Sequence, residues 1–319
     1  MKRTLNLLTA LLFFSLFFPN LSHAVWIWTP QSGKFINPKM AVKSTPREQL
    51  DYALAFMEGR KYTPAMAELK KLVKNYPRAK EAPEAQYYIG KILENTHKSY
   101  EAYKAYQIVI DKYPFSERAA EIVSLQFNIA NGILSGKDKR GKWVKAIVGG
   151  DDRITEIYRS VIKNAPYGKY AAEAQYKIGL YLKERELFQE ARDEFEKTLG
   201  DYPNTEWAKA AKFQIAMADT DRAGTIQHEQ KTNSIALDEF KEFVKSHPDS
   251  DLTPEAKKQI ALLRDKEAQS GYLVGQFYEK QKNYKSAAVY YQNIVSYHAD
   301  TMWGAKALKR LRAIGGHLK

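Results

Sequence analysis

A glycine- and lysine-rich segment near the middle of the chain nearly matches a phosphate-binding loop. In GKDKRGKW, Gly136 is followed after four residues by Gly141 and Lys142. Such a loop follows a strand, and it needs Ser or Thr after the lysine to hold Mg²⁺. Here Trp143 follows the lysine, and the preceding segment has a helical pattern. We therefore interpret the match as chance.

The six histidines form no linear metal-binding or catalytic motif. No two of them are four residues apart, and the pattern HExxH is absent. The Gly-x-Ser-x-Gly turn of hydrolases is absent as well. We expect no metal, no cofactor and no catalytic residue, so the chain is interpreted as a non-enzymatic protein.

The first 24 residues have the three parts of a secretory signal. Lys2 and Arg3 give a positive start, residues 5–18 are almost entirely apolar, and residues 22–24 form a small-x-small cleavage site. An uncleaved anchor is the alternative, but the apolar stretch is shorter than the about 20 residues of a membrane span. We expect cleavage after Ala24 and export from the cytoplasm.

The formal charge is +13, which becomes +11 if Lys2 and Arg3 are removed with the signal. For an exported protein, this charge favours acidic proteins or anionic lipid head groups over nucleic acid as partners. A solvated surface with scattered basic residues is the alternative. The sequence has no cysteine, so disulfides cannot stabilise it and an acylated cysteine cannot anchor it.

The rest of the chain contains six copies of one pattern, each followed by a proline or, in the last copy, an alanine. We call this residue the mark. The marks are Pro77, Pro114, Pro166, Pro203 and Pro248, with Ala299 in the sixth copy. Apolar or aromatic residues lie twelve, eight and four positions before each mark, as at Ala102, Tyr106 and Ile110. A four-residue step keeps side chains on one helical face, so an amphipathic helix is predicted before each mark.

A second helix precedes each of these helices. AQYYIG at residues 85–90 recurs as AQYKIG at residues 174–179. Small residues at two fixed points allow paired helices to approach closely, a large residue fills the space between them, and proline ends the second helix. The residues that carry this packing are Gly90, Ala102, Tyr106, Pro114, Gly179, Ala191, Phe195, Pro203, Gly275, Ala287 and Tyr291. The pattern is that of tetratricopeptide repeats of about 34 residues.

The sequence therefore predicts an all-α, tetratricopeptide-like helical solenoid of about six helix pairs over residues 46–319. Residues 46–166 form the N-terminal repeats, and residues 167–319 form the C-terminal repeats. Insertions are expected at residues 136–150 and near residues 224–233. One unusually long helix is expected at residues 253–282, and a capping helix at residues 300–311.

A stripe of large side chains lies three residues before the small residue of each first helix. Its members are Leu50, Tyr87, Phe127, Tyr176, Phe213 and Tyr272. Core between the helices is the favoured interpretation for most of them. The alternative is a concave groove, in which tyrosines would anchor an extended peptide.

The segment from Leu263 to Thr301 resembles the long helix of the BamD (YfiO-type) components of the bacterial outer-membrane protein assembly machine. Glu267, Tyr272, Gly275 and Tyr278 stand at the expected places, and YALAFMEGRKYTPAMAELKKLVKNYP is similar to the first repeat of that family. The resemblance covers residues 46–311. It implies a periplasmic scaffold on the inner face of the outer membrane. It also implies docking of the C-terminal repeats on the POTRA-type periplasmic domains of the barrel insertase, and reception of unfolded outer-membrane proteins by the N-terminal repeats.

One feature departs from that family, which is normally anchored through a lipidated cysteine after the signal. Val25 stands at that position here. A soluble periplasmic coordinator of the cell envelope or of division, of the Tol-associated type, is therefore the alternative. Such coordinators typically carry a coiled coil before fewer repeats, and no sustained heptads precede residue 46.

The segment VWIWTP, with Trp26 and Trp28, opens the expected mature chain. Residues 25–29 and 34–37 are predicted to form a β-hairpin around the turn residues 30–33. Three roles stay open for its tryptophans: a cap on the first repeat, an anchor at the lipid head groups, or a hot spot for a partner. Trp143 with Lys139, Arg140 and Lys142 is a second candidate anchor for a membrane or a partner.

Overall fold

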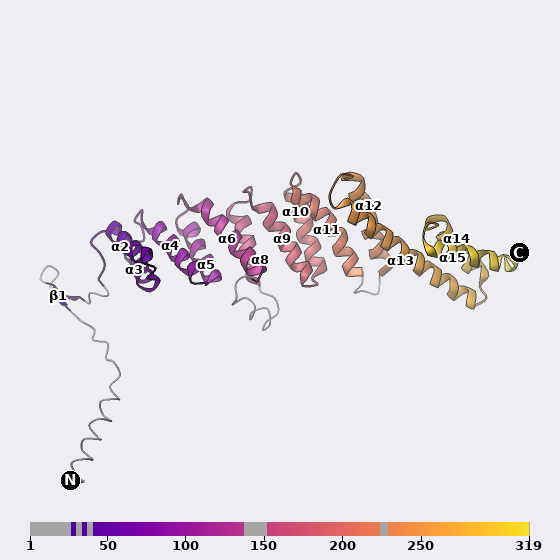
Figure 1. Cartoon of the computed structure of the whole chain (residues 1–319), viewed down its shortest axis with the longest axis horizontal. Coiled ribbons are helices and arrows are strands. Elements are labelled where there is room, and N and C mark those ends of the chain that lie inside the picture. Colours follow the sequence, from indigo (N-terminus) through magenta and orange to yellow (C-terminus); the bar gives the residue numbers. More distant parts are fainter. Residues whose placement is uncertain (1–26, 30–33, 37–40, 137–151, 224–228, 319) are drawn as a thin grey trace, which may run out of the picture. The chain divides into compact units, whose positions relative to one another are not determined.

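The computed structural model describes residues 27–29, 34–36, 41–136, 152–223 and 229–318. Almost all of these residues lie in helices (Figure 1). The expected signal at residues 1–24, Trp26, and the segment with Lys139, Arg140, Lys142 and Trp143 lie outside the described residues. Clustering of backbone contacts divides the chain into two compact units, Met1–Ile92 and Leu93–Lys319.

The first unit contains the predicted hairpin and the first repeat. Strands β1 (Ile27–Thr29) and β2 (Lys34–Ile36) are antiparallel, and Trp28 lies opposite Phe35. Helices α2 (Pro46–Glu58) and α3 (Tyr62–Asn75) follow, and then α4 (Ala82–Asn95) begins. Thr45 caps α2 because its hydroxyl accepts a hydrogen bond from the Glu48 backbone N–H. The hairpin prediction is confirmed for the described residues.

The second unit continues the alternation of first and second helices (Figure 1). Its helices are α5 (Ser99–Lys112), α6 (Ala119–Leu134), α8 (Asp152–Asn164), α9 (Ala171–Glu184), α10 (Phe188–Asp201), α11 (Glu206–Ala223), α12 (Glu229–Ser246), α13 (Thr253–Lys280), α14 (Tyr284–Tyr297) and α15 (Met302–Ile314), and a 3-10 turn, η1 (Gly315–His317), ends the series. The predicted all-α tetratricopeptide-like solenoid is confirmed.

Each second helix ends two residues before its mark. For example, α5 ends at Lys112 before Pro114, and α10 ends at Asp201 before Pro203. Proline lacks a backbone N–H and disfavours helical geometry in the residue before it, so the helix stops there. In the sixth copy α14 ends at Tyr297 although Ala299 replaces proline.

Small residues bring the paired helices together as the spacing predicts. A Cβ atom added at Gly179 in α9 would lie 2.5 Å from the ring of Phe195 in α10, and one added at Gly275 would lie 2.7 Å from the ring of Tyr291. Both rings are fully buried. Ala102, Ala191 and Ala287 are fully buried too, Gly90 lies on the buried face of α4, and Tyr106 is buried in α5.

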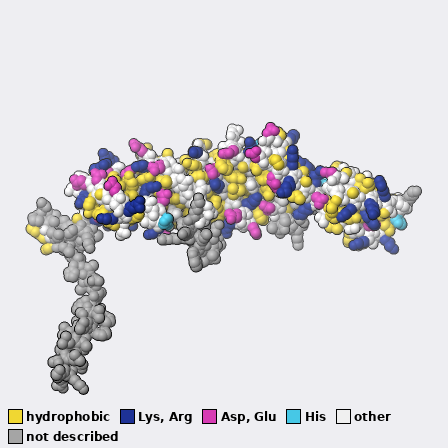
Figure 2. All heavy atoms as spheres, in the orientation of Figure 1, with side chains coloured by type: hydrophobic (Ala, Val, Ile, Leu, Met, Phe, Trp, Pro, Cys, Tyr) yellow, Lys and Arg dark blue, Asp and Glu magenta, His cyan; other side chains and the backbone are white. Residues whose placement is uncertain are grey.

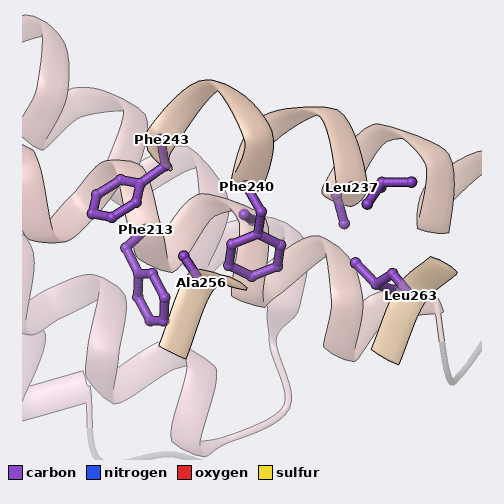
Figure 3. Close-up of a cluster of buried hydrophobic side chains, with 8 residues drawn as sticks. Phe213, Leu237, Phe240, Phe243, Ala256 and Leu263 are labelled. Carbon is purple, nitrogen blue, oxygen red and sulfur yellow. The ribbon is translucent and has the colours of Figure 1, made fainter. Parts of the chain in front are cut away.

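The long helix α13 belongs to two successive cores. Ala256 and Leu263 in its first half join a cluster with Phe213, Phe240 and Phe243 (Figure 3). In its second half Ala268 and Tyr272 join a separate cluster, which includes Tyr291 and Ala307. The predicted long helix is confirmed with two residues fewer at its end. The expected insertion near residues 224–233 is shorter than predicted, because residues 229–233 already lie in α12.

Candidate interaction surfaces

The predicted groove stripe lies in the core. Its exposed fractions run from 3% for Leu50 to 9% for Tyr176. The Tyr176 ring lies 5.5 Å from Phe195 and 5.3 Å from Trp207, measured between ring centroids. Tyr272 repeats this arrangement with Tyr291 and Trp303 at the same two distances. The other members, Tyr87, Phe127 and Phe213, are also buried. These six side chains therefore pack between helices, which agrees with the core interpretation.

Buried polar side chains recur at equivalent repeat positions, where they tie helices together. The Tyr106 hydroxyl donates to Glu94, and the Tyr291 hydroxyl donates to Glu279, each over 2.8 Å. Burial first, and then the hydrogen bond to Glu279, raise the pKa of Tyr291. The hydrogen bond from Arg310 lowers the pKa of Glu279, so that carboxylate stays ionised. These groups are structural partners of one another.

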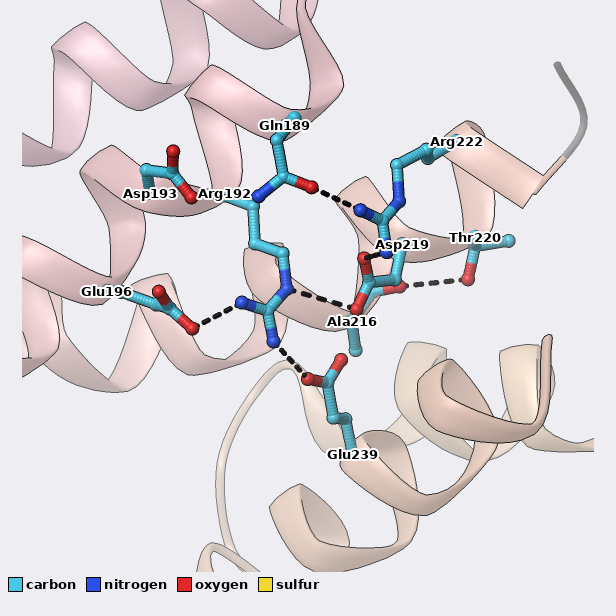
Figure 4. Close-up of polar contacts among 9 residues, drawn as sticks. All are labelled: Gln189, Arg192, Asp193, Glu196, Ala216, Asp219, Thr220, Arg222 and Glu239. Carbon is cyan, nitrogen blue, oxygen red and sulfur yellow. Dashed lines mark hydrogen bonds and ion pairs between the residues drawn. The ribbon is translucent and has the colours of Figure 1, made fainter. Parts of the chain in front are cut away.

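Charged side chains gather around the buried Asp219 where α10, α11 and α12 meet (Figure 4). Arg192 in α10 donates to Asp219 in α11 over 3.1 Å and to Glu239 in α12 over 3.0 Å, and it also pairs with Glu196. Asp219 is 1% exposed and pairs with Arg222 as well, over 2.9 Å. Burial opposes the charge of Arg192, but the hydrogen bond and the charge of Asp219 outweigh this effect and raise the pKa of Arg192.

Glu239 experiences the opposite balance in the same cluster. Burial raises the pKa of Glu239, and the nearby charge of Asp219 adds to this rise. Arg192 acts against both effects. The positive charge of Arg192 thus offsets the repulsion between the carboxylates of Asp219 and Glu239 where the three helices meet.

A notch of about 490 Å³ opens between α12 and α14 along the middle of α13. Its lining residues are Ser234, Leu237, Asp238, Lys241, Arg264, Glu267, Gly271, Tyr290, Asn293, Tyr297 and His298. The notch exists because α13 serves two repeats in succession, which separates the two helices packed on it. Arg264 spans one wall and holds both carboxylate oxygens of Asp300, at 2.7 and 2.6 Å.

An exposed apolar stripe follows another face of α13. Leu262, Leu273 and Phe277 are 55%, 54% and 57% exposed. Their spacings of eleven and four residues are close to whole helical turns, so the three side chains lie along one face. Sequence reasoning missed this stripe, although its spacing is visible in the sequence.

The N-terminal hairpin presents one aromatic pair to solvent. Trp28 is 52% exposed, and Phe35 opposite it is 66% exposed. A cap on the first repeat would bury Trp28 more fully, so its exposure favours the roles that need an accessible ring. The same two alternatives stay open for Trp143, which lies outside the described residues.

Two kinds of feature are absent from the described part of the chain. None of its helices is long and apolar enough to cross a bilayer. No three His, Asp or Glu side chains in it gather as metal ligands would. On the face shown in Figure 2, basic and acidic side chains are interspersed over the described helices.

Two family models match separate parts of the chain. Residues 164–318 match the model of the YfiO family, described as outer membrane lipoproteins. Residues 49–79 and 84–116 match a tetratricopeptide-repeat model. No curated protein matches the chain.

Similar solved structures, all at low identity, include tetratricopeptide-repeat proteins. One from Parabacteroides merdae is 14% identical, with coverage of 83% of this chain and 97% of that one, at a TM-score of 0.34. The C-terminal part of one from Cytophaga hutchinsonii is 15% identical, with coverage of 83% and 88%, at 0.35. MamA from Desulfovibrio magneticus is 14% identical, with coverage of 66% and 99%, at 0.31. These values carry no argument about function. The helix pairs and the repeat model together show tetratricopeptide-like repeats, and residues 164–318 are similar to the YfiO family that the sequence resembles.

Proposed function

We propose that this protein is a non-catalytic periplasmic scaffold of the machinery that assembles β-barrel proteins in the outer membrane. It acts peripherally on the inner face of that membrane. Its C-terminal repeats dock on POTRA-type domains of the barrel insertase, and its N-terminal repeats receive unfolded barrel proteins. The YfiO match and the tetratricopeptide repeats support this role, because repeats of this kind serve protein–protein interaction.

The observation that carries the docking proposal is the exposed stripe on α13. Leu262, Leu273 and Phe277 lie within residues 164–318, the part that matches the YfiO family. More than half of each side chain is exposed although large apolar side chains are stabilised by burial. Leu273 and Phe277 lie one turn apart on the exposed face of a helix, and large apolar side chains of this kind are typical central anchors of a protein interface.

Reception of an unfolded chain is supported by the accessible aromatic side chains of the first unit. Tyr52 in α2 is 42% exposed, contacts Phe56 edge-on at 5.0 Å between centroids, and lies under the ammonium of Lys43 at 4.1 Å. With Trp28 and Phe35, this gives apolar contact area next to hydrogen-bonding groups, which suits an extended, sequence-diverse ligand.

Docking is tested by charge substitution in the middle of the stripe. We expect Leu273→Glu with Phe277→Glu to weaken binding to the purified POTRA-type domains at least about tenfold, because two desolvated anchors are lost. Isothermal titration calorimetry measures the dissociation constant. Both positions are exposed helix sites, so the melting temperature should change little.

Val289→Glu is the matched control, since Val289 lies on the neighbouring helix α14 and is 67% exposed. It should bind as the parent does. Unchanged affinity of the double variant would remove α13 from the interface. Capture of division or peptidoglycan proteins in place of the insertase would support the Tol-associated alternative.

A further inference from the structure

Two aromatic side chains project from consecutive loops of the second unit. Phe115 follows Pro114 in the loop between α5 and α6 and is 98% exposed. Tyr167 follows Pro166 in the loop between α8 and α9 and is 97% exposed. Both therefore place almost their whole side-chain surface in water, which is unfavourable for rings of this size.

The two loops lie next to each other on one edge of the second unit. The loop after α5 and the loop after α8 each run from a second helix to the next first helix, and successive helices are antiparallel, so these two loops lie on the same edge (Figure 1). The ends of α5 and α8 are joined directly, since Asn164 donates to Gln107 over 2.8 Å. Asn164 also donates to Gln126 in α6 over 3.0 Å. We call the loops 113–118 and 165–170 the aromatic edge.

Repeat packing does not require an aromatic residue at these positions. The residue after the proline is Asn204 in the loop after α10 and Asp249 in the loop after α12. Those loops have the same helix–proline–helix arrangement with a short polar side chain instead. Phe115 and Tyr167 thus contribute nothing visible to the fold that Asn204 and Asp249 do not.

The charge of the aromatic edge also differs from that of the loops that follow it. Lys112, Lys163 and Lys169 are exposed, and among the described residues none of the three forms an ion pair. The acidic neighbours are Asp111, near the end of α5, and Glu117, on the first loop. From two residues before the proline to three after it, the first two loops carry Lys112, Glu117 and Lys169, whereas residues 201–206 and 246–251 each carry two acidic residues and no Lys or Arg.

We propose that the aromatic edge binds the surface of a lipid membrane that contains anionic head groups, with Phe115 and Tyr167 inserted at head-group level. Aromatic rings and lysines are both favoured at that level, where a ring meets the acyl boundary and an ammonium meets phosphate. Each ring is almost fully exposed, and a deformable lipid layer accommodates two such rings without preformed pockets. A protein partner would need two matching pockets. The proposal rests on the proposed function only for placing the protein beside a membrane.

Vesicle binding of the whole chain tests this directly. The parent should co-sediment with vesicles of phosphatidylethanolamine and phosphatidylglycerol, and more weakly with vesicles of phosphatidylcholine. We expect Phe115→Ser with Tyr167→Ser to lower the partition coefficient for the anionic vesicles about tenfold, because two inserted rings are lost. Neither residue is buried, so circular dichroism and the melting temperature should match the parent.

Tyr297→Ser is the matched control. Tyr297 ends the second helix α14 and is 72% exposed, but the loop after it carries Asp300 and no lysine. It should partition as the parent does. Equal vesicle binding by the double variant and the parent would overturn the proposal, and so would loss of a protein partner with unchanged vesicle binding. The POTRA-type domains should bind the double variant normally, so failure of the docking proposal would appear separately.

Discussion

Replacing Gly179 with valine should lower the free energy of unfolding by about 3 kcal/mol, the upper part of the usual range for overpacking. Even the first added carbon would lie 2.5 Å from the Phe195 ring, and that ring is fully buried. The ring can therefore move only by displacing its own neighbours, such as Ala191 and Ala211. Urea unfolding followed by circular dichroism measures the loss.

Gly132→Val is the matched control for that result. Gly132 also lies in a first helix, α6, and a Cβ added there meets nothing within 4 Å. Its substitution should change stability by less than about 0.5 kcal/mol, the usual range for a surface site. Phe195→Leu should partly rescue Gly179→Val, because the smaller side chain vacates the contact. A Gly179→Val protein as stable as the parent would mean that the register of the fourth repeat is wrong.

Replacing Arg192 with methionine should cost about 3 kcal/mol, the lower end of the range for breaking a buried ion pair. The substitution removes the partner that Asp219 and Glu239 share, and Asp219 is almost fully buried. Arg222 keeps one contact with Asp219, which limits the loss. Chemical unfolding again gives the magnitude. Adding Asp219→Asn and Glu239→Gln should recover part of the stability, because the carboxylates then no longer need a cation.

Lys241→Met is the matched control for Arg192→Met, because it removes a positive charge from an exposed ion pair. Lys241 pairs with Asp238 over 3.1 Å, but the two side chains are 53% and 72% exposed. Exposed pairs are screened by water, so this variant should lose less than about 0.5 kcal/mol. Equal destabilisation by Lys241→Met and Arg192→Met would show that the Arg192 cluster stabilises the fold no more than an exposed ion pair does.

Local spacing predicted the helices and their contacts. The distance from Gly179 to Phe195 and on to Pro203 places a small residue, a ring and a helix end in one repeat, and the structure has all three in these places. The same spacing at Gly275 and Tyr291 predicted the last repeat without a proline. Periodicity succeeds here because each repeat packs mainly on its neighbours in sequence.

Spacing could not decide whether a stripe of large side chains would be buried by a neighbouring helix or left exposed. Tyr176 and Tyr272 have the pattern of groove residues and of core residues alike, and they are buried by Trp207 and Trp303 about thirty positions later. The Arg192 cluster joins residues 27 and 47 positions apart, so no local pattern announces it. Exposure of Phe115 and Tyr167 likewise depends on which neighbours reach their loops.

The measurement closest to the central claim is a crosslinked pull-down of the tagged protein from its own cell envelope, with membranes fractionated beforehand. The proposed function predicts recovery of a POTRA-containing barrel protein from the outer-membrane fraction, and loss of that protein with Leu273→Glu and Phe277→Glu. Recovery from the soluble fraction alone, together with division or peptidoglycan proteins, would contradict it.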